Sequence, residues 1–294
     1  MSLPWRGYCA TFISLIITFM KTIIVPTDFS PIATNAISFA ADMATNINAS
    51  LLLLHVYQVP VSMTDVPVVM VSTEELKKSS ESKRKEIQDA LTHTTSGKIK
   101  IYSEARMGDV SDELEDVCKR IRPFAVIMGT RGASGVERVL FGSTTLTTIR
   151  HLTWPVIVVP PGKEYGTGIK KIGFACDFDK VIETTPIQFI KNMVKEFGAE
   201  LHVLNVDHDG KHFKPETPDE SLMLHALLQD LNPNYHFIDN VNIEEAINEF
   251  VDKNNIDLLI TIPKKHKLLD SLFKKSSTKQ LVTQSHVPVM CVHE

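Results

Sequence analysis

The order of structural elements can be worked out from residues 20–30, MKTIIVPTDFS, because the chain repeats this stretch as IKKIGFACDFD at residues 169–179. In the first copy a short β-branched run ends in proline and aspartate, which is typical of a buried parallel strand and its carboxyl-terminal loop. Ser30 then supplies an N-cap, and Pro31 stands at the first helical position. The stretch therefore predicts a strand that leads into a helix, and its repeat predicts a second unit of the same kind.

Strand and helix patterns alternate along the rest of the first copy. Short apolar runs indicate buried strands, whereas apolar residues recurring at helical spacing indicate helices. Strands are expected at residues 22–29, 49–59, 98–106, 124–130 and 155–161, and helices at 32–48, 74–93 and 109–121. Because strands alternate with helices, the strands should form a parallel sheet that is covered on both faces.

The same order returns in the second half, so the sequence predicts a tandem duplication. Successive strands of the first copy are matched by ELHVLNV at residues 200–206, IDLLITIP at 256–263 and VPVMCVHE at 287–294. We expect two α/β domains at residues 20–162 and 169–294, each doubly wound around a five-stranded parallel sheet. Glycines in and beside the linker at residues 163–168 favour a flexible hinge.

The composition is that of a globular protein, with 43% hydrophobic and 22% charged residues. A formal net charge of −4 argues against a nucleic-acid-binding protein held by a basic face. The cysteines lie far apart without a CxxC pair, which suits reduced thiols, at positions Cys9, Cys118, Cys176 and Cys291. We therefore expect a cytoplasmic protein without nucleic-acid partners.

Residues 1–19 precede the first expected strand, and the uncharged apolar run GYCATFISLIITFM occupies residues 7–20. A membrane span needs about 18 or more apolar residues, so this run is short for one. Met20 begins a strand directly, which favours the interpretation of residues 1–19 as a translated leader without a role in the fold. A signal or membrane anchor and an additional helix are the alternatives. We expect no membrane association.

A glycine-rich loop, GTRGASGVERVLFGSTT at residues 129–145, follows a buried strand. Ligands of open α/β sheets bind at the carboxyl ends of the strands. Glycines there allow positive φ and close approach of a phosphate, while backbone N–H groups and a helix N-terminus hold the anion. The loop lacks the lysine of a GxxxxGK[ST] loop. The alternative is a structural strand-to-helix connection in which Ser143 is the N-cap.

These motifs resemble those of the universal stress protein family in its tandem-domain form, over residues 20–162 and 168–294. The loop of the nucleotide-binding branch has glycines separated by two and then nine residues, and this spacing is matched by Gly129, Gly132 and Gly142, followed by Ser143. The family also has an aspartate after its first strand and a valine after its second, which Asp28 and Val56 match.

The resemblance implies an adenine nucleotide alpha hydrolase-like fold and ATP binding by the first domain, with or without Mg²⁺. It implies that Asp28 contacts the ribose or the adenine, that the Val56 backbone reads the adenine edge, and that the loop holds the phosphates. The expected nucleotide-binding residues are Pro26, Thr27, Asp28, Val56, Met128, Gly129, Arg131, Gly132, Gly142, Ser143, Thr144 and Thr145. Helix capping alone is the alternative role for Asp28. No catalytic residue or metal ligand is expected.

The second copy departs from this pattern. Its residues at the three glycine positions are Ile262, Lys265 and Lys275. Side chains at these positions remove the backbone freedom that a phosphate cradle needs, so we expect a degenerate domain that does not bind ATP. Neighbouring lysines and serines are typical of a solvated surface, with a weak anion site as the alternative.

The leading hypothesis is a cytoplasmic stress-response protein that acts as a nucleotide-dependent binding module or switch. A slow ATPase or nucleotide transferase is one alternative, and a non-nucleotide interaction protein is another. Phosphoryl transfer needs a positioned base or water-orienting group, and the loop has no obvious one. Because the family commonly pairs through its last strand, residues 156–159 and 287–292 are expected to pair within one chain as a pseudo-dimer. Further homodimerisation stays open.

Overall fold

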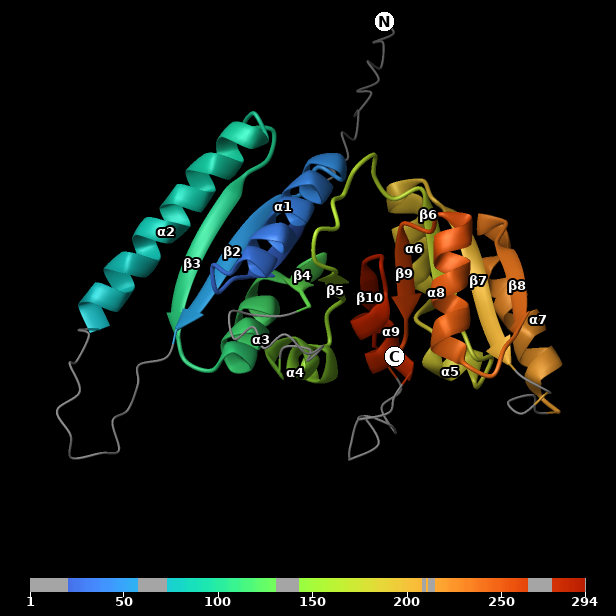
Figure 1. Ribbon diagram of the computed structural model, residues 1–294. Helices are drawn as coiled ribbons and strands as arrows, with labels where there is room; N and C mark the ends of the chain where they lie inside the picture. Colours follow the sequence, from blue (N-terminus) through green and yellow to red (C-terminus); the bar gives the residue numbers. More distant parts are fainter. Residues whose placement is uncertain are drawn as a thin grey trace, which may run out of the picture.

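The computed structural model of the protein describes residues 21–57, 73–130, 143–207, 210, 215–263 and 277–293. Two α/β units stand side by side and meet at their strands β5 and β10 (Figure 1). The first unit consists of β1 (Thr22–Pro26), α1 (Pro31–Asn46), β2 (Ser50–Tyr57), α2 (Thr73–Thr94), β3 (Ile101–Met107), α3 (Val110–Ile121), β4 (Ala125–Gly129), α4 (Ser143–His151) and β5 (Val156–Val159). This is the order that the sequence predicts.

The second unit repeats this order with one interruption. It consists of β6 (Lys171–Ala175), α5 (Val181–Thr184), α6 (Ile187–Phe197), β7 (Glu200–Asp207), α7 (Thr217–Leu228), a 3₁₀ turn (Gln229–Leu231), β8 (Asn234–Asp239), α8 (Ile243–Asn254), β9 (Leu258–Thr261), α9 (Ser277–Gln284) and β10 (Val289–Cys291). Pro186 separates α5 from α6, because proline donates no helical hydrogen bond and Thr185 before it is extended. The first unit has the continuous helix α1 at this place.

The ten strands of the described residues form one sheet in the order β3-β2-β1-β4-β5-β10-β9-β6-β7-β8. Pairing is parallel within each unit, and the units join through antiparallel pairing of β5 with β10. Val158 lies opposite Val289, Ile157 opposite Met290, and Val156 opposite Cys291. The pairing of the two last strands that the sequence predicts is therefore present within one chain, and each strand covers the edge of the other.

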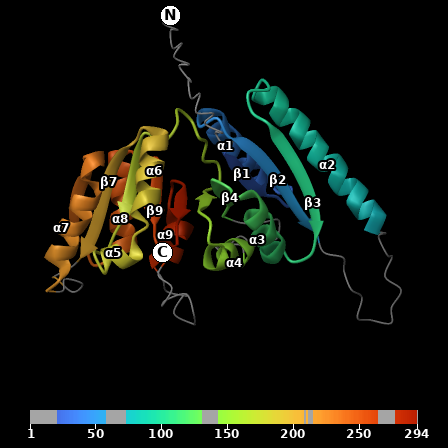
Figure 2. The same ribbon diagram turned by 180° about the vertical axis from the view of Figure 1, so that it is seen from behind.

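Side chains of successive strand residues point to opposite faces of the sheet and enter two separate apolar cores. One core contains Ile157 and Met290 with buried residues of α1 and α6, while the other contains Val158 and Val289 with buried residues of α3, α4, α8 and α9. In the second unit α8 lies in front of the sheet in Figure 1, and α6 comes forward when the molecule is viewed from behind in Figure 2. The sheet is covered on both faces, as predicted.

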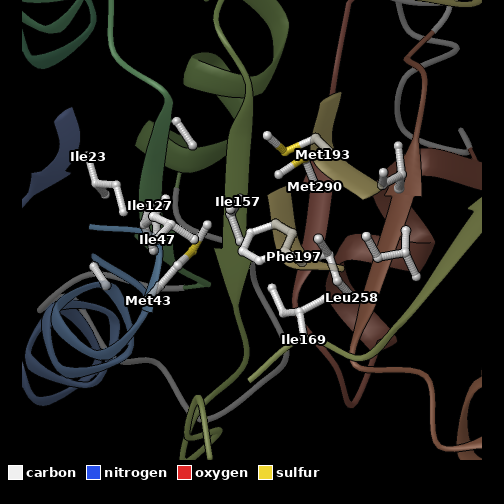
Figure 3. Packing of buried hydrophobic residues seen from close by; sticks show 14 of the residues in the cluster. Ile23, Met43, Ile47, Ile127, Ile157, Ile169, Met193, Phe197, Leu258 and Met290 are labelled. Carbon is white, nitrogen blue, oxygen red and sulfur yellow. The ribbon is translucent and has the colours of Figure 1, made fainter. Parts of the chain in front are cut away.

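The apolar core is continuous across the junction between the units (Figure 3). Met43 of α1 and Phe197 of α6 both belong to the cluster around Ile157 and Met290. Phe197 also meets the ring of Phe124 edge-to-face, with 6.4 Å between the ring centroids. Since these side chains come from both units, separation of the units would expose them to water at a large free-energy cost.

The linker at residues 163–168 is not the flexible hinge that its glycines predict. Tyr165 is buried, its hydroxyl donates to Asn46 Oδ1 at 3.0 Å, and its ring packs edge-to-face on Phe39 with centroids 5.3 Å apart. A buried aromatic ring with a hydrogen-bond partner outweighs the conformational freedom of the neighbouring glycines. The linker is therefore held against α1 by the packing and the hydrogen bond of Tyr165.

Residues 1–19, which we interpret as a leader, lie outside the described residues. In the part of the chain that is described, no helix combines the length and the apolar character that crossing a membrane requires.

Two histidines of the second unit form a partly buried pair beside α8. His202 Nδ1 lies 3.0 Å from His236 Nε2, the rings stack with centroids 5.2 Å apart, and Phe250 of α8 packs against both. Burial lowers the pKa of both imidazoles, and the charge of Lys171 lowers the pKa of His202 further. Glu200, whose carboxylate lies 3.6 Å from His202 Nε2, partly offsets this effect on the pKa.

We predict that acid destabilises the protein through this pair. A histidine with a lower pKa in the folded chain binds its proton more tightly after unfolding, so its stabilisation is complete above about pH 6.5 and is lost as the pH falls through the folded pKa. Urea unfolding should show the free energy of unfolding falling toward pH 5.5, by at most about 1.4 kcal/mol per pH unit for each histidine. His202→Gln/His236→Gln should lose the part of this slope that the pair contributes and keep the part due to His55, whose pKa burial also lowers. His93→Gln, at an exposed position, should keep the whole slope. An unchanged slope in the double variant would contradict the prediction.

Candidate functional site

The strand order places a topological switch point between β1 and β4. From β1 the chain moves outward through β2 and β3, then returns to the other side of β1 and continues through β4 and β5. Open α/β sheets bind ligands in the crevice at the carboxyl ends of the strands at such a point. Thr27 and Asp28 follow β1 and Gly129 ends β4, so the structure brings these predicted site residues to the switch point.

The turn after β1 is organised by its own side chains. The N–H of Phe29 donates to Thr27 Oγ1 at 3.0 Å, and the N–H of Ser30 donates to Asp28 Oδ1 at 3.0 Å. Ser30 is the N-cap of α1, as predicted, because its hydroxyl accepts from Ala33 N at 3.2 Å. Asp28 thus shapes the turn without being the helix cap, and it is exposed at the edge of the sheet.

Glycine is required at position 129 because Ile32 of α1 approaches the backbone there. The prediction that Gly129 adopts a positive φ is wrong. Gly129 does not adopt a positive φ. A Cβ atom at this position would lie 2.4 Å from Ile32 Cγ2 and 3.0 Å from the Ile32 carbonyl oxygen in the first turn of α1. The missing side chain therefore lets α1 begin directly against the end of β4, next to the Asp28 turn.

The first turn of α4 completes this edge. Thr145 is buried and its hydroxyl donates to the Gly129 carbonyl at 3.1 Å, which fixes the start of α4 at the end of β4. The helix begins at Ser143, its first turn has no acidic side chain, and Thr144 is half-buried. A helix N-terminus carries partial positive charge and unpaired N–H groups, so this arrangement favours an anion.

Some of the remaining predicted site residues lie in the described part of the chain, and others lie outside it. Pro26 ends β1 and Val56 lies near the end of β2, both half-buried, whereas Met128 of β4 is buried in the core. The loop positions Arg131, Gly132 and Gly142 lie outside the described residues, so their role stays a prediction. No group of three His, Cys, Asp or Glu side chains suited to a metal ion is found in the described residues.

The sequence alone did not indicate a cluster of side chains next to the Asp28 turn. His55 of β2 lies between the Asp28 turn and α2, with its ring centroid 4.4 Å from that of Phe29. Lys83 of α2 places its ammonium group 5.7 Å from the centroid of the Phe29 ring. Arg84 of α2 is buried and donates to Ser103 Oγ at 3.3 Å. A histidine at the end of an otherwise apolar strand was the signal that could have located this cluster.

The second unit builds the same turn with different neighbours. Asp177 Oδ1 accepts from the N–H of Asp179 at 3.2 Å, so this carboxylate also shapes its turn. Ile262, which follows β9, packs against the apolar core. The aligned positions Lys265 and Lys275 lie outside the described residues.

Two doubly wound α/β units that share one sheet, with a topological switch point between β1 and β4, define a tandem protein of the adenine nucleotide alpha hydrolase-like fold. The chain belongs to the universal stress protein family, whose model matches residues 20–160 and 168–293.

Known relatives match this chain in halves and as a whole. Two universal stress proteins of Methanocaldococcus jannaschii are 28% identical over 149 residues and 27% identical over 160 residues. These alignments cover 49% and 47% of this chain, and 84% and 94% of the relatives. The crystal structure of a universal stress protein from Archaeoglobus fulgidus aligns with a TM-score of 0.69 at 20% identity, covering 92% of this chain and 98% of that one. This last likeness shows the shared tandem fold.

Proposed function

We propose that the first domain binds ATP at the carboxyl ends of β1, β2 and β4, and that the protein acts as a nucleotide-dependent binding module or switch. The observation that supports this most directly is the approach of Ile32 to Gly129, which brings the Asp28 turn to the end of β4. The hydrogen bond from Thr145 to Gly129 adds the N-terminus of α4 to the same place. The end of β4 thus has beside it a carboxylate suited to a nucleoside and a helix N-terminus suited to phosphates.

Each part of ATP has a matching group in this arrangement. Asp28 would accept hydrogen bonds from ribose hydroxyls or the adenine amino group, and the backbone at Val56 would pair with the adenine edge. The phosphates would lie on the glycine loop and on the N–H groups at the start of α4, which favour negative charge. Mg²⁺ would arrive with ATP, because this ion binds mainly through phosphate oxygens and water.

The second domain is proposed not to bind ATP. Asp207 and Asp239 end β7 and β8 opposite each other, where Tyr57 and Met107 face each other in the first domain. Carboxylates at this edge disfavour a polyphosphate anion through like-charge repulsion. Ile262 adds a side chain where the first domain has glycine.

A stress-response role in the cytoplasm is proposed on the basis of family membership. The competing hypothesis of a slow ATPase is separated from a binding module by one measurement, the release of ADP over long incubation of the full chain with ATP. A switch should hold ATP without turnover.

The binding site is tested by calorimetric titration of the full chain with ATP, using aspartates at equivalent positions of the two domains. Asp28→Asn should weaken ATP binding about tenfold, because it removes a charged hydrogen-bond acceptor. Asp177→Asn makes the same chemical change in the second domain and should leave the affinity unchanged. Wild-type protein should bind a single ATP per chain. Equal losses in the two variants, or two ATP molecules per chain, would contradict the proposal.

A further inference from the structure

His55 supports the Asp28 turn, residues 27–30, through a hydrogen bond. Its Nδ1 lies 2.7 Å from the carbonyl oxygen of Thr27. Because a carbonyl only accepts, Nδ1–H donates this bond, and the second proton of an imidazolium goes to Nε2. The hydrogen bond to Thr27 is therefore present with the neutral and with the protonated imidazole, and protonation changes only the charge of His55.

The turn that His55 braces is strained. Phe29 adopts a left-handed conformation with φ 63°, which is unfavourable for a bulky side chain and persists only where the surroundings hold it. Its N–H donates to Thr27 Oγ1, and its ring packs against His55 with centroids 4.4 Å apart. His55 thus contacts the residues on both sides of Asp28, one by a hydrogen bond and one by ring packing.

The second domain provides an internal comparison. Phe178 repeats the left-handed conformation with φ 50°. Asn205 stands at the position of His55, and its Nδ2 donates to the Cys176 carbonyl at 3.0 Å. In both domains a side-chain N–H at this position donates to the carbonyl of the residue before the aspartate, and an amide can do this as well as an imidazole. Only the first domain supplies it with a group that can become charged near neutral pH.

Among the described residues, three charged groups act on His55. Asp28 lies on the braced turn, and Lys83 and Arg84 lie on α2. Burial lowers the pKa of His55 most, the hydrogen bond that His55 donates to the Thr27 carbonyl and the charge of Asp28 raise it, and the two cations of α2 lower it. At neutral pH the imidazole is therefore mainly uncharged, and it takes up its proton at a lower pH than an ordinary histidine does.

We propose that His55 is a positioning residue for the nucleotide site and that its protonation strengthens the binding of ATP. The inference rests on the proposed function of the first domain. An imidazolium directly behind Asp28 would offset the repulsion between this carboxylate and the anionic nucleotide. By linkage, bound ATP must raise the affinity of His55 for its proton by the same factor.

The wild-type chain, His55→Asn and His55→Ala together separate the positioning effect of His55 on ATP binding from the effect of its charge. The dissociation constant for ATP is measured by calorimetry between about pH 5 and pH 8, because the lowered pKa of His55 places its titration below that of an ordinary histidine. His55→Asn copies Asn205 and keeps the N–H donor without the titration, while His55→Ala removes both. The ratio of wild-type to His55→Asn affinity should rise about threefold to tenfold from the alkaline to the acidic end. Taking this ratio at each pH cancels the titration of the ATP phosphates.

His55→Ala should bind ATP about tenfold more weakly than His55→Asn at every pH, because the Thr27 carbonyl loses its donor. Asn205→His, the reciprocal change in the second domain, should leave the wild-type pH profile unaltered. In the wild-type chain, NMR titration of the His55 ring should show its pKa rising when ATP is added.

A constant ratio of wild-type to His55→Asn affinity across the pH range would overturn the inference while leaving the proposed function intact. Equal affinities of His55→Ala and His55→Asn would overturn the positioning role. Absence of ATP binding by wild-type protein at every pH would overturn the proposed function and this inference with it.

Discussion

Titration of the Gly132→Lys protein with ATP should show binding weakened by at least about a hundredfold, the loss expected when two charge-assisted hydrogen bonds are removed. The variant copies Lys265 of the second domain into the first. A Cβ and a long side chain at this position would block the close approach of phosphate to the loop backbone, which glycine permits. Calorimetry on the full chain measures the loss.

Two controls test whether the variant still folds and whether a single glycine is enough to create an ATP site. The thermal transition of Gly132→Lys should match that of the wild-type protein, because residue 132 belongs to none of the described strands and helices. Lys265→Gly should create no second ATP site, since Ile262 and Lys275 remain at the other two glycine positions. ATP affinity equal to that of wild type would mean that the glycine loop serves only to connect β4 to α4.

The strand and helix order could be predicted because each element carries its own local signal. Ser30 and Pro31 mark the start of α1, and the structure confirms both. The pairing of β5 with β10 was predictable for a different reason: a short, strongly apolar last strand leaves an edge that must be covered. Thr185-Pro186, which divides the helix of the second unit, was equally visible in the sequence as a helix-breaking signal.

The candidate site was less predictable, because its contacts join residues far apart in the sequence. His55 and Thr27 are 28 positions apart and meet only once β1 and β2 are paired. The role of Gly129 depends on the approach of Ile32 in α1, so the glycine alone indicated flexibility where the structure needs space. Tyr165 fastens a linker whose glycines predicted a hinge, since local composition carries no information about a partner such as Asn46.

The β5–β10 junction leads to the largest expected effect on stability. Val158 is 1% exposed, pairs with Val289 across the junction, and lies in an apolar core shared by both units. Val158→Asp would bury a carboxylate without a partner and should lower the free energy of unfolding by about 3–5 kcal/mol. Val241→Asp introduces the same charge at a position that is 73% exposed, and should change it by less than about 0.5 kcal/mol.

The shared core also predicts how the loss of stability in Val158→Asp is divided between the two units. A charge at a junction between independently stable domains would separate them and leave each folded, whereas Val158 contributes to packing on both sides of the junction. Denaturant unfolding of Val158→Asp, followed by hydrogen exchange on peptides from each unit, should therefore show both units losing protection in one transition. Because β10 pairs with β5 on one side and with β9 on the other, disruption at Val158 reaches the second unit directly. Loss of protection confined to residues 21–159, with the second unit unchanged, would show that each unit folds by itself and that the junction is only a docking surface.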